Sequence, residues 1–223
     1  MQLFPSMMCA DFDRLGEDVE ELIAAGADGF HLDVMDGHFV PNFGLGLGDV
    51  QCICRHAKAH NVPCDVHLMA EDADILPELF VKAGVDIVYV HPEGERTVNS
   101  TLQKIARLGA HPGIAVDPGL SLEALKYTLP AVDYVLIMTV NPGFAGQKYL
   151  DYVTSKIAEF AAVKEEYGFK IFVDGACSPE VIKKVGELGA DGAILGTRLC
   201  SAKIRAMLSC FRSCTPYANL LIC

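Results

Sequence analysis

The feature that most constrains the fold is a regular alternation of short apolar segments with longer amphipathic ones. The apolar segments have the length and composition of buried strands, and the intervening segments repeat apolar residues at helical spacing. The predicted strands are 2–8, 29–34, 64–69, 86–91, 112–117, 134–140, 170–175 and 192–196. The predicted helices are 13–25, 48–60, 73–83, 98–108, 121–129, 151–167, 179–188 and 201–212. Eight strands that alternate with helices are typical of an α/β fold whose parallel strands close into a (β/α)8 TIM barrel.

A short glycine motif at the ends of predicted helices supports this pattern. It occurs at 25–28, 83–86 and 188–191, with a looser copy at 108–111. Glycine at such a position supplies the left-handed residue that ends a helix before the next strand. The alternative fold, an open doubly wound sheet, would carry a glycine-rich fingerprint after the first strand, and residues 6–9 do not form one.

Length, composition and charge narrow the classes of protein that fit. A chain of 223 residues without a linker or low-complexity break is predicted to form a single domain, 1–223. A net charge of −11 with scattered Lys and Arg argues against nucleic acid or a membrane surface as a partner. No uncharged apolar run reaches the roughly 18 residues of a membrane span, and the first residues lack the pattern of a signal peptide.

The cysteine pattern indicates a reducing compartment. The 9 cysteines form an odd set without the spacing of a disulfide framework or a zinc site. Several lie in apolar segments, where a free cysteine is usually a small buried hydrophobe. We therefore expect a cytoplasmic location. The cysteine-rich tail, 210–223, has no functional interpretation from its sequence.

Four metal-competent side chains come near the ends of three predicted strands. His31 and Asp33 are two residues apart, so both point to one face of their strand, and His67 and Asp174 end two other apolar runs. The loops that follow the strands build the active site of a TIM barrel, so these side chains are expected to converge. Any one of them alone fits a hydrogen-bonded core residue. Two imidazoles and two carboxylates together suit a divalent ion such as zinc, manganese, cobalt or iron.

Small residues on three neighbouring loops predict an anion site at the same end of the barrel. The segments are 141–147 after the sixth strand, Gly175-Ala176 after the seventh, and Gly196-Thr197 after the eighth. Small residues let backbone N–H groups approach a phosphate, and TIM barrels often bind phosphate with the loops after strands seven and eight. Each glycine alone fits an ordinary turn. Together they favour a phosphorylated substrate.

Other residues near the strand ends fit two interpretations each. Asp36, His38 and Asn42 either form a turn or contribute to binding, and His91 either caps a strand or reaches the catalytic end. Four methionines either fill the core or form a soft apolar wall beside the substrate. They are Met8, Met35, Met69 and Met138.

Several segments, in order and covering about residues 4–200, closely resemble the ribulose-phosphate 3-epimerase family. They are FPSMMCADF (4–12), HLDVMDGHFVPN (31–42), DVHLM (65–69), HPE (91–93), MTVNPGFAGQ (138–147), VDGACSPE (173–180) and LGT (195–197). The resemblance implies a TIM barrel, in agreement with the strand and helix pattern. It also implies an isomerase that inverts C3 of a phosphorylated 2-ketose by two-base proton transfer through an enediolate.

The resemblance assigns roles to individual residues. One divalent metal ion, with Mg added to the candidates above, would be bound by His31, Asp33, His67 and Asp174. Asp33 and Asp174 would also be the catalytic acid/base pair. The substrate would be bound by Ser6, His67, Gly143, Phe144, Ala145, Gly146, Gly175, Ala176, Gly196 and Thr197. Family members assemble into dimers or hexamers, so a homo-oligomer is expected.

Several positions depart from the ribulose-phosphate enzymes and look more like the D-allulose-6-phosphate 3-epimerase branch. They are Met8-Cys9 in place of Leu-Ser, Ala145 and Ala176 in place of glycine, and Thr197 in place of serine. None removes a metal ligand, so only the length of the substrate is affected. The expected reaction is D-allulose 6-phosphate to D-fructose 6-phosphate. The alternative is D-ribulose 5-phosphate to D-xylulose 5-phosphate, a reaction of the pentose phosphate pathway.

Two further alternatives are another barrel enzyme and a non-catalytic barrel that binds sugar phosphates. A Schiff-base aldolase needs a lysine at the end of an inner strand, whereas Lys170 begins one. A related decarboxylase would carry an Asp-x-Lys-x-x-Asp element, and the third strand instead holds Asp65 and His67. A binding protein needs no paired carboxylates, so Asp33 and Asp174 favour an enzyme.

Overall fold

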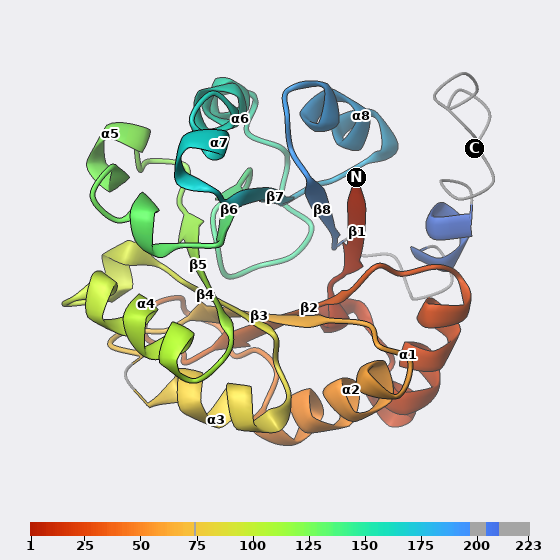
Figure 1. Cartoon of the computed structure of the whole chain (residues 1–223). Coiled ribbons are helices and arrows are strands. Elements are labelled where there is room, and N and C mark those ends of the chain that lie inside the picture. The colour runs from red at the N-terminus through yellow and green to blue at the C-terminus, as the bar shows by residue number, and fades with distance from the viewer. Residues whose placement is uncertain (74, 197–203, 210–223) are drawn as a thin grey trace.

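The computed structural model describes residues 1–73, 75–196 and 204–209, and eight parallel strands form its centre (Figure 1). The order of neighbours is β1-β8-β7-β6-β5-β4-β3-β2, so each strand from β2 to β7 pairs with the one that follows it in the chain, and β1 pairs with β8. The strands are β1 (Gln2–Pro5), β2 (Phe30–Met35), β3 (Cys64–Met69), β4 (Ile87–Val90), β5 (His111–Val116), β6 (Tyr134–Met138), β7 (Lys170–Asp174) and β8 (Gly192–Leu195). The predicted α/β barrel is therefore confirmed.

The barrel closes between β1 and β2 through few contacts, which we call the seam. Ser6 forms a single parallel bridge with His31. Below it, the Asp28 N–H donates to the Leu3 carbonyl at 3.1 Å, and the Leu3 N–H donates to the Asp28 carboxylate at 2.9 Å. The seam thus joins the first and last strands of the sheet order and completes a nearly closed barrel.

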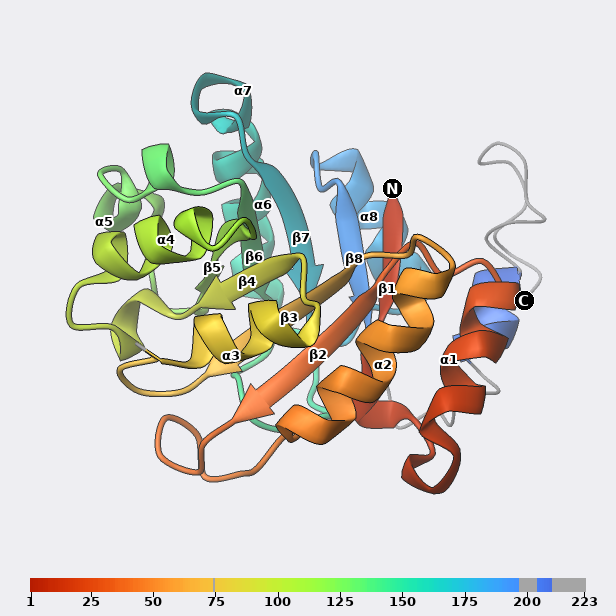
Figure 2. The same cartoon turned by 60° about the horizontal axis from the view of Figure 1, so that its bottom comes forward.

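Helices flank the strands, as Figures 1 and 2 show. The α-helices are α1 (Leu15–Ala24), α2 (Leu47–Ala59), α3 (Leu76–Ala83), α4 (Val98–Arg107), α5 (Leu122–Leu125), α6 (Thr154–Ala161), α7 (Lys164–Tyr167) and α8 (Pro179–Glu187). The 3₁₀ turns are η1 (Met7–Cys9), η2 (Phe12–Arg14), η3 (Pro92–Gly94), η4 (Leu129–Ala131) and η5 (Asp151–Val153). Residues 204–209 are helical and lie beside α1, where Arg205 contacts Glu21.

Several predicted elements differ from the observed ones. The strand predicted at 2–8 ends at Pro5, because residues 7–9 turn into η1. The helix predicted at 121–129 is shorter, because α5 ends at Leu125 and a separate 3₁₀ turn, η4, follows at Leu129–Ala131. The helix predicted at 151–167 divides into η5, α6 and α7. Of the last predicted helix, 201–212, only 204–209 lie within the described residues.

Alternating strand residues build two separate cores. Phe30, Leu32 and Val34 of β2 belong to the outer core, between the strands and the helices. The inner core fills the barrel and includes Phe4 and Phe172, whose rings lie 5.0 Å apart. Because both faces of the strands are buried, their sequences are nearly continuous runs of apolar residues.

Glycines in the strands or just before them make room for the large rings of the inner core. A Cβ at Gly113 would lie 2.5 Å from the ring of Tyr89, and one at Gly192 would lie 2.3 Å from Phe172. Gly29 and Phe4 form a third such pair, also at 2.3 Å. The aromatic rings thereby fill the lower part of the barrel and form a floor beneath its open end.

None of the five described cysteines forms a disulfide, and Cys54, Cys64 and Cys177 are buried, as expected for small hydrophobes. Among the described residues, no helix has the length and apolar character needed to cross a membrane.

The tight packing of this aromatic floor predicts the effect of one added methyl group. Gly113→Ala should lower the free energy of unfolding by about 1–3 kcal/mol, because the methyl group would overlap the Tyr89 ring. Gly119→Ala is the matched control, since a Cβ there meets nothing within 4 Å. Urea denaturation of both variants measures the difference. Equal stabilities of the two variants would contradict the tight packing of the floor.

Candidate metal and active site

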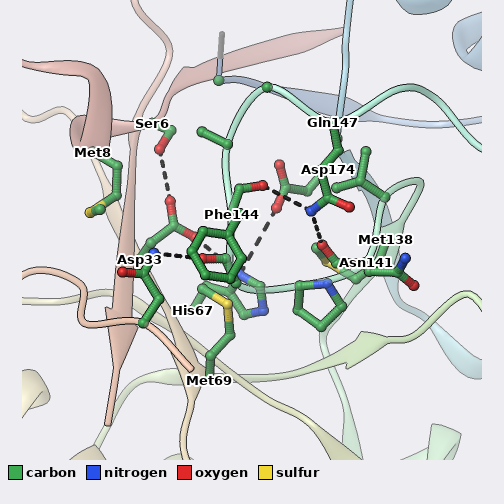
Figure 3. A pocket seen from close by; sticks show the side chains of 18 of the residues that line it. Ser6, Met8, Asp33, His67, Met69, Met138, Asn141, Phe144, Gln147 and Asp174 are labelled. Carbon is green, nitrogen blue, oxygen red and sulfur yellow. Dashed lines mark hydrogen bonds and ion pairs between the residues drawn. The ribbon is translucent and has the colours of Figure 1, made fainter. Parts of the chain in front are cut away.

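One pocket lies at the carboxyl ends of the strands and contains most of the predicted site residues (Figure 3). Its walls come from the ends of β1, β2, β3, β6, β7 and β8 and from the loops that follow them. The four methionines line it, which supports their interpretation as an apolar wall: Met8, Met35, Met69 and Met138. Parallel strands bring these chain-distant segments together because their carboxyl ends meet at one end of the barrel.

Four buried or partly buried side chains meet at the base of this pocket. They are His31, Asp33, His67 and Asp174, and one candidate ligand atom from each lies within 4.8 Å of all the others. His31 Nε2 is 3.1 Å from Asp33 Oδ1 and 3.9 Å from Asp174 Oδ2. His67 Nδ1 is 3.3 Å from Asp33 Oδ1 and 4.0 Å from Asp174 Oδ2. The predicted convergence of these side chains is observed.

The cluster fits a divalent metal ion. Ligands about 2.0–2.1 Å from a tetrahedral ion stand about 3.3 Å from one another, close to the separations observed here. The donors are two imidazole nitrogens and two carboxylate oxygens, which suit zinc, manganese, cobalt or iron. A bound cation would also offset the negative charge of the carboxylates.

Asp65 fixes the orientation of His31 from behind. Its Oδ1 lies 2.6 Å from His31 Nδ1, and both side chains are fully buried. With Nδ1 occupied in this way, Nε2 is the nitrogen that faces the cluster. The sequence shows Asp65 two residues before His67 on an inward face, but its role depends on the neighbouring strand and was not predicted.

His91 and Asp117 extend the polar cluster beyond His67. His91 Nε2 lies 2.8 Å from His67 Nε2, and His91 Nδ1 lies 3.1 Å from Asp117 Oδ1. His91 therefore reaches the catalytic end, one of its two predicted interpretations. Asp117 was missed, although its place just after β5, at the carboxyl end of a strand, was a usable signal.

Burial and neighbouring charges shift the pKa values of His31, Asp33 and Asp174 in different directions or by different amounts. Burial opposes a charged His31, but the Asp65 and Asp33 carboxylates outweigh it and hold the His31 pKa well above its usual range. Burial would also raise the pKa of Asp33, yet His31 brings that pKa below its usual range. Burial, reinforced by the Asp33 and Asp65 carboxylates, raises the pKa of Asp174 to about 7. Without a cation, Asp33 is ionised and Asp174 holds a proton through mildly acidic conditions.

Ser6 lies at the pocket but makes a contact that was not predicted. Its hydroxyl donates to Asp33 Oδ2 at 2.8 Å, as Figure 3 shows. Ser6 also carries the seam bridge to His31, so one residue closes the barrel and orients a carboxylate. Its predicted contact with substrate remains a proposal.

The loop after β6 is held in a defined shape beside the cluster. Gln147 Nε2 donates to the carbonyls of Asn141 and Phe144, at 2.5 and 2.9 Å. Asn42 Nδ2 donates to the Gly143 carbonyl at 2.7 Å, from the loop after β2. Asn42 therefore supports a binding loop, whereas Asp36 forms a turn by accepting from the backbone of His38 and Phe39.

Most predicted anion-site residues line this same pocket. They are Gly143, Phe144, Ala145, Gly146, Gly175, Ala176 and Gly196. Thr197 lies outside the described residues. Gly175 has φ +123°, and Ala176 follows with φ +50°, a left-handed conformation that favours glycine. The pocket thus combines the polar cluster with a rim of small residues and exposed backbone.

The comparisons with known proteins agree with this geometry. Residues 2–200 match the ribulose-phosphate 3-epimerase family. The chain is 37% identical over 197 residues to the ribulose-phosphate 3-epimerase of Rhodobacter capsulatus, covering 88% of this chain and 85% of that protein. It is 40% identical over 203 residues to the chloroplastic ribulose-5-phosphate-3-epimerase of Arabidopsis thaliana, covering 89% of this chain and 71% of that protein. The Bacillus subtilis ribulose-phosphate 3-epimerase is 38% identical to this chain over 200 residues, covering 88% of this chain and 91% of that protein.

Solved structures with lower identity share the fold. Phosphoribosyl anthranilate isomerase from Thermus thermophilus matches with a TM-score of 0.66 and 15% identity, covering 96% of this chain and 99% of that one. Thiamine phosphate pyrophosphorylase from Pyrococcus furiosus matches with a TM-score of 0.63 and 16% identity, covering 95% and 94%. These similarities support the barrel architecture and carry no argument about the reaction.

The raised pKa of Asp174 predicts how the stability of the metal-free protein depends on pH. The folded protein keeps a proton on Asp174 up to pH about 7, whereas the unfolded chain loses it near pH 4, so unfolding releases a proton between these values. Stability contributed by this group therefore falls as the pH rises from about 4 to 7. Asp174→Asn should remove that loss and stabilise the metal-free protein at pH 8 by about 1 kcal/mol or more.

Urea denaturation in the presence of a chelator, at pH 4.5 and pH 8, measures this difference. The variant and the wild type should differ at pH 8 and converge at pH 4.5. A constant difference across the range would show that Asp174 titrates normally.

The left-handed backbone of Ala176 predicts a stabilising substitution. Ala176→Gly should raise the free energy of unfolding by about 0.5–1 kcal/mol, because the strain of a Cβ at φ +50° outweighs the extra entropy of an unfolded glycine. Ala145→Gly on the neighbouring loop is the control, since Ala145 does not have a positive φ. It should leave stability unchanged or lower it. Thermal unfolding of both variants compares them, and a destabilised Ala176→Gly protein would refute the strain.

Proposed function

The chain belongs to the ribulose-phosphate 3-epimerase family and is a carbohydrate-phosphate 3-epimerase, and from this premise we propose that it inverts C3 of D-allulose 6-phosphate to give D-fructose 6-phosphate. The observation that carries the reaction is the cluster of His31, Asp33, His67 and Asp174, of which all but His31 line the same pocket as the small-residue loops. One end of a ketose phosphate would meet the cluster while the phosphate meets the backbone of those loops.

Asp33 and Asp174 are the proposed acid/base pair. They come from β2 and β7, which are separated around the barrel by β1 and β8, so they approach a bound sugar from different directions. Their pKa values lie far apart in the protein without a cation, as expected when one carboxylate acts as base and the other as acid. In one direction Asp33 takes the C3 proton and Asp174 delivers one to the opposite face; in the other direction the roles exchange.

The same four residues would hold a divalent cation. When bound, such an ion would act as a Lewis acid that stabilises the negative charge developing on the C2 and C3 oxygens of the enediolate. The hydrogen bond from Ser6 keeps one oxygen of Asp33 oriented, and the four methionines that line the pocket would exclude water from the reacting carbons.

The choice of a six-carbon substrate rests on the pocket wall. Cys9, Ala145 and Ala176 all line the pocket, and each departs from the pattern of the ribulose-phosphate enzymes. D-Ribulose 5-phosphate is the second candidate, and the names of the curated relatives favour it. The assembly of the chain into a homo-oligomer stays a proposal drawn from the family resemblance.

Isotope incorporation and substitution together test the proton transfer. Turnover in deuterium oxide should place deuterium at C3 of the product, because the acid that delivers the new C3 hydrogen has exchanged its own proton with solvent and is not the group that abstracts the original one. Asp174→Asn should lower kcat by about 10²–10⁴-fold, the usual contribution of a general acid or base. Asp133→Asn is the control, since Asp133 pairs with His111 at the amino end of β5, away from the pocket at the carboxyl ends of the strands. NMR of the product gives both readouts, and retention of the original C3 hydrogen would exclude the mechanism.

Coupled assays with both sugar phosphates test the substrate. The kcat/KM should be higher for D-allulose 6-phosphate, and chelation of metal should abolish turnover of either compound. A preference for D-ribulose 5-phosphate would overturn the choice of substrate and leave the reaction class intact. Turnover of neither compound by metal-loaded protein would overturn the reaction itself.

A further inference from the structure

The two ring nitrogens of His67 face different partners. Nδ1 faces the cluster, 3.3 Å from Asp33 Oδ1, whereas Nε2 points away from it toward His91 Nε2, 2.8 Å distant. The His67 and His91 side chains are both fully buried. A contact of 2.8 Å between two ring nitrogens is a hydrogen bond only when one of them carries a proton and the other does not.

Metal binding would decide which nitrogen holds that proton. For His67 to offer a lone pair from Nδ1, its proton must be on Nε2, and Nε2 must then donate to His91. His91 must accept at Nε2, so a neutral His91 carries its own proton on Nδ1. The 2.8 Å contact is satisfied by this arrangement only if His91 has an acceptor for its Nδ1–H.

Asp117 is placed to be that acceptor. Its Oδ1 lies 3.1 Å from His91 Nδ1, although the ring is turned so that the N–H does not point straight at the oxygen. Both atoms are buried, and neither has a hydrogen-bond partner among the described residues. The Lys156 ammonium donates to the carbonyls of Asp117 and Pro118, at 2.7 and 2.9 Å, and so fixes the backbone that carries this carboxylate.

We propose that His91 and Asp117 are positioning residues that hold His67 in the tautomer with a free Nδ1, so that it can bind the cation. This inference rests on the proposed metal-dependent function. The two imidazole ligands would then be supported differently, because Asp65 contacts His31 directly whereas Asp117 acts on His67 through His91. Outer partners of metal-bound histidines commonly serve this purpose.

A packing role for His91 is the competing explanation, since its ring also lies 4.7 Å from the ring of Phe39. A phenylalanine at position 91 would keep an aromatic ring there and lose the acceptor. A glutamine would lose the ring and keep both an acceptor for His67 and a donor for Asp117. The two substitutions therefore separate packing from hydrogen bonding.

Zinc affinity of the full-length protein, measured by competition with a chromophoric chelator, is the first readout. His91→Phe should weaken zinc binding by about 10–100-fold, while His91→Gln should stay within about threefold of the wild type. His111→Phe is the matched control, because His111 also pairs with an aspartate, Asp133, at 2.7 Å, but at the other end of β5. Thermal unfolding of each metal-free variant shows whether it is folded.

The second readout needs no variant. Nitrogen-15 spectra of the imidazoles in the zinc-loaded wild type should show protons on His67 Nε2 and His91 Nδ1. Protonation of His91 at Nε2 instead, or equal zinc affinity of the wild type and His91→Phe, would overturn the inference. Loss of affinity in His91→Gln equal to that in His91→Phe would also overturn it. Failure of the wild type to bind zinc or any other of the candidate cations would instead overturn the proposed metal site.

Discussion

The parallel register of β2 against β3 is the constraint on which the site depends. In this register His31 lies beside Asp65, and Asp33 lies beside His67. Side chains alternate between the two faces of a strand, so a shift of either strand by one residue would send its polar groups to the helix-covered outer face. The apolar residues between them, such as Leu32, fill that outer core and so hold the register. Packing outside the barrel thereby fixes the chemistry inside it.

Burial of several charged groups in one place is possible because they contact one another. An isolated buried charge is strongly destabilising, whereas a paired and hydrogen-bonded one is tolerated. His31 lies between Asp33 and Asp65, and the hydroxyl of Ser6 reaches Asp33. The carboxylates still exceed the positive charge available. Burial, reinforced by the neighbouring carboxylates, raises the pKa of Asp174 to about 7, and burial also raises the pKa of Asp65. The arrangement is therefore one that a cation completes.

Much of the fold and the central cluster could be predicted from the sequence, because both follow from short-range periodicity. The inward direction of His31 and Asp33 depends only on strand alternation. The exact ends of η1 and α5 depend on local turns, which the apolar pattern does not register. The place of His91 beside His67 depends on the pairing of two strands and on ring rotamers, which no local pattern contains.

The seam between β1 and β2 links folding to ligand binding. Its single bridge, from Ser6 to His31, is also the point where the polar cluster begins. The cluster draws on β2 and β3 on one side of the seam and on β7, reached through β1 and β8, on the other. Anything bound there connects the two edges, and its binding free energy adds to the work of separating them. A cation bound by the cluster would therefore also stabilise the closure of the barrel between β1 and β2.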